Sequence, residues 1–220
     1  ISCWSLQQSK MLTAAGGGGV ATTEDAVLAD RLRQICDHGK AKSGTRLEDA
    51  TASYRVTALG NNYRLSEIQA AFARAQLGKL GQFIERRGEA CVALRDRLSQ
   101  IPGLEFCQPR PGVELSNYTF PVLFPQESFS APLARIDAAM YAEGVATLPI
   151  ALTELSHVHP LFAEAAVRSR HDAYRLRGAA ADPPYGWQTL PVAEKIAAEL
   201  LLLPVHPGLS ELDLDGIVEA

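Results

Sequence analysis

The sequence has few cysteines and no long apolar run. Its four cysteines, Cys3, Cys36, Cys91 and Cys107, are far apart and form no Cys-x-x-Cys pair, which argues against a zinc ribbon or a redox dithiol. No apolar segment approaches the roughly 20 residues that span a bilayer, and the first residues lack the basic, apolar and small-residue pattern of a secretory signal. We therefore expect reduced thiols and a cytoplasmic location.

A basic surface is also missing. The 220-residue chain has a net charge of -4, and its lysines and arginines are scattered. Nucleic-acid-binding domains usually carry a basic stripe, so we expect no nucleic-acid partner, and we expect no membrane partner either. Hydrophobic residues make up 47% of the chain, which is typical of a globular protein with a substantial core.

Several common catalytic and binding motifs are absent. No Gly-x-Ser-x-Gly elbow supports serine hydrolase chemistry. The glycines at 16–19 lack the Gly-Lys-Ser/Thr ending of a nucleotide P-loop, so a tight turn is the better interpretation. The pair His157-Val-His159 has no Cys, Asp or third His at ligand spacing, and we therefore expect no metal site.

Lys10 is a candidate nucleophile. It is the single lysine between Ile1 and Thr23, and this segment contains no acidic residue. An amine attacks a carbonyl only when it is unprotonated, so a nucleophilic lysine needs few carboxylates nearby and partial desolvation. From the residues alone, an ordinary surface lysine beside a strand and a turn is the more common alternative.

Short strands are expected around Lys10. Residues 2–6 and 20–23 predict strands, residues 11–13 predict a further short one, and the glycines at 16–19 predict a tight turn between them. The sequence then becomes helical.

Two helical regions follow these strands. Thr23 is expected to cap a helix that ends at Gly39. The polar residues 40–54 predict an irregular surface loop. Ser66 and Gln69 form a capping-box pattern at the head of a second helical stretch, which contains several glycines and is either one kinked helix or two helices.

The pattern changes after Pro102, where strands and helices alternate. It predicts a small α+β domain with an antiparallel sheet and helices on one face. The domain boundary is expected between Gly78 and Pro102. The expected strands are 104–107, 118–124 and 145–148, and the expected helices are 133–143, 192–201 and 210–218.

Three segments resemble a known family. The first runs from Ser5 to Lys10-Met-Leu-Thr and into the glycine cluster, and the second is Gly60-Asn-Asn-Tyr-Arg-Leu-Ser-Glu-Ile-Gln. The third combines Leu190-Pro-Val-Ala-Glu-Lys with Leu203-Pro-Val-His-Pro. In this order they resemble the DegT/DnrJ/EryC1/StrS aminotransferases, which are pyridoxal phosphate enzymes of fold type I acting on keto-sugars and cyclitols.

The resemblance implies an α/β fold, the pyridoxal-phosphate-dependent transferase fold of type I. Residues 1–85 are then expected to form the end of the large, cofactor-binding domain, and residues 86–220 the small C-terminal α+β domain. A complete family member has a comparable length of chain before the lysine segment. We therefore expect this sequence to be the C-terminal portion of a longer enzyme, with a two-subunit arrangement as the alternative.

The resemblance also implies roles for four cofactor residues. Lys10 matches the Schiff-base lysine that bonds to the aldehyde of pyridoxal 5'-phosphate. Ser5 matches a serine near the cofactor phosphate, and Gln8 lies in the same motif. Asn62 matches an asparagine that reaches the phosphate of the neighbouring subunit's cofactor, which implies a homodimer with shared active sites.

Substrate residues follow from the same resemblance. Arg64 is a candidate for binding a substrate carboxylate, because a guanidinium matches a carboxylate bidentately. Tyr63 in the same block and His159 are further candidates. The amino donor would be glutamate or glutamine. The acceptor would be a nucleotide-linked keto-sugar or a cyclitol ketone.

Two alternatives stay open. Related dehydrating enzymes carry His in place of the lysine, so Lys10 favours aminotransfer over pyridoxal-phosphate-dependent dehydration. Most members read Thr-Ala-Gly-Glu-Gly-Gly after the lysine, whereas Ala15 and Gly16 stand here at the places of that Gly and Glu. Because this carboxylate is missing, a non-catalytic dimerisation or partner-binding module of the same fold stays open as a second interpretation.

Overall fold

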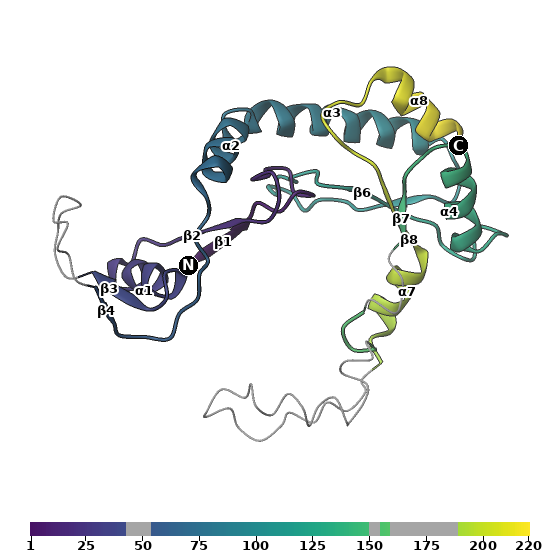
Figure 1. Ribbon diagram of the computed structural model, residues 1–220. Coiled ribbons are helices and arrows are strands. Elements are labelled where there is room, and N and C mark those ends of the chain that lie inside the picture. Colours follow the sequence, from purple (N-terminus) through teal and green to yellow (C-terminus); the bar gives the residue numbers. More distant parts are fainter. Residues whose placement is uncertain (43–53, 150–154, 159–188) are drawn as a thin grey trace. The chain divides into compact units, whose positions relative to one another are not determined.

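The chain forms two compact units. The computed structural model describes residues 1–42, 54–149, 155–158 and 189–220 (Figure 1). The N-terminal unit covers Ile1–Phe83 and the C-terminal unit Ile84–Ala220. The assignment of residues 1–85 and 86–220 to a large and a small domain stays a prediction. None of the helices in the described ranges is long and apolar enough to cross a membrane.

A β-hairpin opens the N-terminal unit. Strand β1 (Ser2–Ser5) pairs antiparallel with β2 (Gly19–Thr22), and Ser5 lies opposite Gly19 at the inner end. The first and last expected strands are thereby confirmed. The short strand expected at 11–13 is wrong, because these residues belong to the loop that the hairpin closes.

Helix α1 (Ala26–Cys36) follows the hairpin. Its N-cap is Asp25, whose carboxylate accepts hydrogen bonds from the amides of Val27 and Leu28 at 2.8 and 3.0 Å. The prediction of Thr23 as the cap is wrong by two residues. The Thr23 hydroxyl instead accepts a hydrogen bond from the Asp25 amide at 3.1 Å. A carboxylate that satisfies two free helix amides is the stronger cap.

A second hairpin lies where the sequence predicts an irregular loop. Strand β3 (Lys40–Lys42) pairs antiparallel with β4 (Tyr54–Val56). The prediction is therefore wrong at both ends of the segment 40–54, and residues 43–53 lie outside the described part of the chain. Alternation of charged and apolar residues in Lys-Ala-Lys is too short a signal to identify a strand.

Two separate helices come next. Helix α2 (Glu67–Leu77) begins with the predicted capping box of Ser66 and Gln69, and it ends at Gly78. Helix α3 (Leu80–Leu98) starts immediately afterwards and carries the chain into the C-terminal unit. Of the two interpretations left open, the structure has two helices.

The C-terminal unit contains a four-stranded antiparallel sheet with the order β5-β6-β8-β7. Within the described residues, its helices are α4 (Leu133–Ala142), α7 (Pro191–Glu199) and α8 (Glu211–Glu219), in addition to most of α3. The strands are β5 (Glu105–Phe106), β6 (Phe120–Leu123), β7 (Leu148–Pro149) and β8 (Leu200–Leu203).

Strand β8 corrects the helix expected at 192–201. Helix α7 ends at Glu199, and the next four leucines form a central strand that pairs with both β6 and β7. Leu201 and Leu203 are buried in the core, whereas Leu200 and Leu202 point to the other face and are half-buried.

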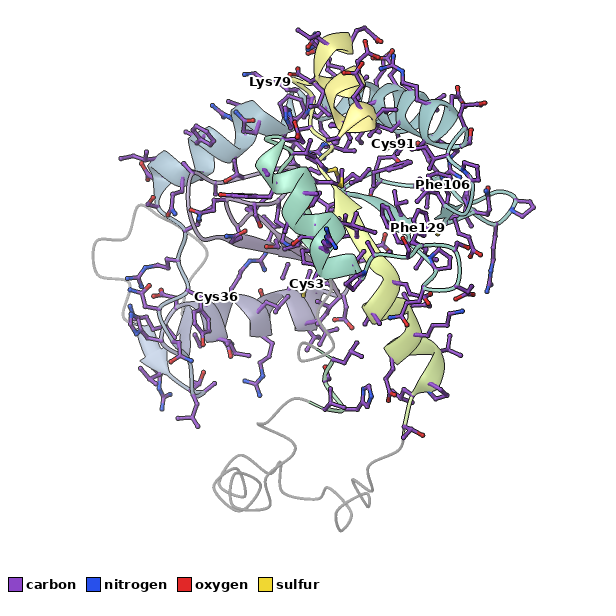
Figure 2. The ribbon with its side chains drawn as sticks, turned by 90° about the vertical axis from the view of Figure 1, so that its right-hand side faces the viewer. Cys3, Cys36, Lys79, Cys91, Phe106 and Phe129 are labelled. Atoms are coloured by element: carbon purple, nitrogen blue, oxygen red, sulfur yellow. The ribbon has the colours of Figure 1, made fainter. Side chains whose placement is uncertain are left out.

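The main hydrophobic core lies on one face of this sheet. Helices α3, α4 and α8 cover it, with Leu94 and Leu201 fully buried at its centre. Cys91 on α3 and Phe106 on β5 belong to the same packed region (Figure 2). Helices on one face of an antiparallel sheet confirm the expected α+β arrangement of this unit.

Candidate functional site

Lys10 lies in a loop that the first hairpin closes. The Leu6 amide donates to the Gly18 carbonyl, and the Ala14 amide donates to the Leu6 carbonyl, both at 2.9 Å. Leu6 and Ala14 are buried, with 8% and 0% of their surface exposed. The Lys10 amide donates to Gln7 at 2.9 Å, which forms a turn within the loop. Residues 6–18 are thus a defined loop that presents an exposed lysine at its middle.

Ser5 and Gln8 lie in the same element as Lys10. Ser5 ends β1, and its hydroxyl accepts the Gln7 amide at 3.4 Å. Gln8 occupies the turn before Lys10, and all three predicted residues are exposed. Sequence reasoning missed Gln7, whose side-chain oxygen accepts the Ser9 amide at 2.8 Å and shapes the turn.

The glycine cluster after Lys10 is a packed turn. A Cβ on Gly18 would lie 3.1 Å from Leu65 and 3.2 Å from the Cβ of Ala14, which is closer than side chains normally approach. Glycine at 18 therefore allows the loop to pack against the segment before α2. Gly17 has open space beside its Cα.

Ala15 has an unusual backbone conformation. Its φ is +56°, in the left-handed region, and its amide donates to the Thr13 hydroxyl at 3.1 Å. Gly16 follows with a φ of +148°, which only glycine adopts easily. The residue that stands in place of a family glycine is thus the one that carries backbone strain.

Replacing Ala15 with glycine is expected to increase the free energy of unfolding by about 0.5–1 kcal/mol. The left-handed region costs an L-residue roughly 1–2 kcal/mol, and the larger entropy that glycine loses on folding offsets about half of this gain. Urea denaturation of the longest natural form of the chain measures the change. Gly16→Ala is the matched control and is expected to destabilise. Equal stability of Ala15→Gly and the wild type would contradict the assigned strain.

The block that contains Asn62 is anchored to the end of α1. Asn62 forms an isolated antiparallel bridge with Asp37. The Asn61 amide donates to Ile35 at 2.9 Å, and the Tyr63 amide donates to Cys36 at 3.0 Å. The side chains of Asn62 and Tyr63 are exposed, so backbone bonds fix the block while its polar groups stay accessible.

Arg64 pairs with a carboxylate of its own chain. Its guanidinium donates to Asp37 Oδ1, and the ammonium of Lys40 lies 3.4 Å from the same oxygen. Burial raises the pKa of Asp37, but the hydrogen bond from Arg64 and the charges of Lys40 and Arg64 outweigh it and hold the pKa below its usual value. Sequence reasoning missed Asp37, because no local pattern links it to Arg64.

Of the two histidines in His157-Val-His159, the structure describes only His157. His159 lies outside the described residues. His157 Nε2 is 2.8 Å from Glu194 Oε1, which also accepts the Leu190 amide at 2.9 Å. Both bonds lower the pKa of Glu194, and the histidine contributes most. Within the described ranges, no group of three or more His, Cys, Asp or Glu side chains is arranged to hold a metal ion.

Two cavities lie in the C-terminal unit. One of about 380 Å³ is lined by residues of β5, β6 and α7, including Lys195 and the buried Glu199. The other, of about 230 Å³, lies beside Cys91 and Arg95 of α3. The candidate site residues Ser5, Gln8, Lys10 and Asn62 belong to the N-terminal unit.

This architecture defines the class of the protein. The mixed α/β chain has part of the fold of type I pyridoxal-phosphate-dependent aminotransferases. The aminotransferase TlmJ of Streptoalloteichus hindustanus superposes on it with a TM-score of 0.71 at 26% identity, over 99% of this chain and 50% of that one. The sequence, moreover, matches the DegT/DnrJ/EryC1/StrS aminotransferase family over residues 1–220. The chain belongs to this family.

Curated relatives agree with the family. The erythromycin biosynthesis sensory transduction protein EryC1 of Saccharopolyspora erythraea is 28% identical over 99% of this chain and 50% of its own length. The UDP-N-acetyl-3-dehydro-alpha-D-glucosamine 3-aminotransferase of Acidithiobacillus ferrooxidans is 31% identical over 96% of this chain and 47% of its own. The chain thus spans about half the length of the curated relatives that it matches.

Proposed function

We propose that this chain supplies the lysine-bearing part of a pyridoxal-phosphate-dependent aminotransferase. The observation that carries the proposal is the position of Lys10, whose exposed side chain lies in a loop that backbone hydrogen bonds close. An accessible lysine amine in a fixed loop is suited to covalent chemistry with an aldehyde.

The donor groups present in the loop fit the cofactor. The amine of Lys10 suits the aldehyde. The hydroxyl of Ser5, at the end of β1, and the side-chain amide of Gln8, in the loop, suit the phosphate. Gly17, with open space beside its Cα, lets a ligand approach the backbone closely. Asn62 has an exposed carboxamide that can donate a hydrogen bond to a phosphate. In our proposal, this phosphate belongs to the cofactor of the second subunit in a homodimer with shared active sites.

The bound cofactor would supply an electron sink for the carbon next to the transferred amine. Lys10 would anchor the cofactor covalently, and its freed Nζ would then move the proton at that carbon. One flexible amine can perform both tasks in turn. We further propose that Tyr63, Arg64 and His159 contact the substrates. To bind a substrate carboxylate, the Arg64 guanidinium would either bind Asp37 and the substrate together or break its ion pair with Asp37.

We propose glutamate or glutamine as the amino donor, and a nucleotide-linked keto-sugar or a cyclitol ketone as the acceptor. The name of the Acidithiobacillus ferrooxidans relative, a UDP-sugar 3-aminotransferase, supports an acceptor of the nucleotide-linked kind.

Borohydride reduction tests the proposal. The longest natural form of the chain, incubated with pyridoxal phosphate and reduced, is expected to carry one phosphopyridoxyl group on the peptide that contains Lys10, as identified by mass spectrometry. Lys79, an exposed lysine between α2 and α3, is the internal control and is expected to stay unmodified (Figure 2). A protein without an adduct, or with label spread over its lysines, would point instead to a non-catalytic module of this fold.

A further inference from the structure

We propose that Gln69 is a positioning residue that fixes the loop of Lys10 to the block of Asn62. It lies in the first turn of α2, and helix capping is the role that its sequence position predicts. The structure gives its side chain a second bond that capping does not require. This inference rests on the proposed function, because it assigns Gln69 to the segments that would hold the cofactor.

The carboxamide of Gln69 uses both of its ends. Oε1 accepts the amide and the hydroxyl of Ser66, at 3.3 and 3.0 Å, which completes the capping box. Nε2 donates to the carbonyl of Gly17 at 3.0 Å, across 52 residues of sequence. The orientation of the carboxamide is determined by its partners, because the Ser66 amide can only donate and the Gly17 carbonyl can only accept.

The bond to Gly17 acts on the loop of Lys10. Gly17 precedes Gly18, whose carbonyl accepts the Leu6 amide, and the Leu6 carbonyl in turn accepts the Ala14 amide. These bonds join the two ends of the segment in which Lys10 lies. Gly18 also packs against Leu65, the residue before the helix cap. Holding the Gly17 carbonyl therefore fixes where the closed loop lies relative to the start of α2.

The other end of Gln69 acts on the block of Asn62. Ser66 follows Asn62 by only four residues, and the Arg64 amide between them donates to the Asn62 side chain at 3.5 Å. The Tyr63 amide bonds to the end of α1. A single side chain thus spans the two candidate cofactor segments. In the proposed homodimer, these segments belong to different active sites, so Gln69 would also connect the two sites.

Two variants separate positioning from capping. Gln69→Glu keeps an oxygen for the capping box, in which glutamate is a preferred residue, but it removes the donor to Gly17. Ser66→Ala weakens the cap and leaves the donor to Gly17 in place. If Gln69 only caps the helix, Ser66→Ala is expected to disturb the Lys10 loop more than Gln69→Glu does. If Gln69 positions the loop, Gln69→Glu is expected to disturb it more.

The experiment uses the longest natural form of the chain. Hydrogen exchange at the Leu6 and Ala14 amides, followed by NMR without cofactor, is expected to accelerate about tenfold in Gln69→Glu and to stay at the wild-type rate in Ser66→Ala, since one lost hydrogen bond changes an equilibrium by roughly 3–10-fold. The dissociation constant of pyridoxal phosphate is expected to rise by a similar factor in Gln69→Glu alone. Thermal denaturation first establishes that both variants fold.

Each outcome has a distinct meaning. Wild-type exchange and cofactor affinity in a folded Gln69→Glu overturn the positioning role. Accelerated exchange in a protein that forms no cofactor adduct supports the mechanical link and overturns the proposed function instead. If Gln69→Glu does not fold, Gln69→Lys replaces it: lysine keeps a donor for Gly17 and loses the cap acceptor, so near wild-type exchange is expected, and tenfold faster exchange overturns the inference.

Discussion

Replacing Lys10 with alanine is expected to lower the turnover of the natural enzyme by about 10²–10⁴-fold or more. A positioned group that transfers a proton contributes about this factor to a reaction rate, and Lys10 would also provide the covalent anchor. Steady-state kinetics with an amino donor and a keto-sugar acceptor measure the loss. The loop should survive the change, because the bonds that close it come from Leu6, Ala14 and Gly18 and not from the lysine side chain.

Two controls make the result specific. Lys79→Ala removes an exposed lysine of the same unit and is expected to leave turnover unchanged. A small amine such as methylamine, added to Lys10→Ala, is expected to restore part of the rate, because it can enter the space left by the side chain and transfer the proton. Full activity in Lys10→Ala would exclude Lys10 as the reacting amine.

Local signals in the sequence predicted the elements around the site. The capping box of Ser66 and Gln69 depends on residues three positions apart, and the structure confirms it. The two strands of the hairpin that bears Lys10 lie where the sequence predicts strands, although the loop between them is longer than the expected turn. These features form because neighbouring residues satisfy one another's backbone groups, and a reader of the sequence can see all the partners at once.

Contacts between distant residues could not be predicted in the same way. Asp37 meets Arg64 across 27 residues, and Gln69 meets Gly17 across 52. Neither partner carries a pattern that identifies the other. The positive φ of Ala15 is also unexpected, since alanine is not a residue that normally adopts it. Tertiary packing, which the sequence does not display, determines all three.

The strand β8 shows a different limit. Four consecutive leucines at 200–203 continue directly from a helical pattern, and a short apolar run fits a buried strand as well as a helix. Leucine favours helices intrinsically, so propensity supports the wrong choice. The run forms a strand because it can pair with β6 on one side and β7 on the other, which supplies the backbone hydrogen bonds that a buried segment needs.

Replacing Gly39 with alanine is expected to lower the free energy of unfolding by about 2–5 kcal/mol, a large part of the stability of a typical domain. Gly39 has a φ of +72°, and an added Cβ would overlap the carbonyl of Ala58. The backbone cannot move aside cheaply, because the Gly39 amide donates to Gln34 at 2.8 Å and its carbonyl accepts the Thr57 amide at 2.9 Å.

The cost would extend to the candidate site. A Cβ on Gly60 would overlap the Gly39 amide, so the two glycines allow the block of Asn62 to lie against the end of α1. Gly81→Ala is the matched control: Gly81 lies within α3, nothing lies within 4 Å of an added Cβ, and alanine there is expected to stabilise by about 0.5–1 kcal/mol. Urea denaturation of the longest natural form measures both. Changes of opposite sign in the free energy of unfolding would locate the effect in the close approach of Gly39 and Ala58. A similar change in both variants would mean that glycine content alone determines stability and that this contact does not hold the Asn62 block.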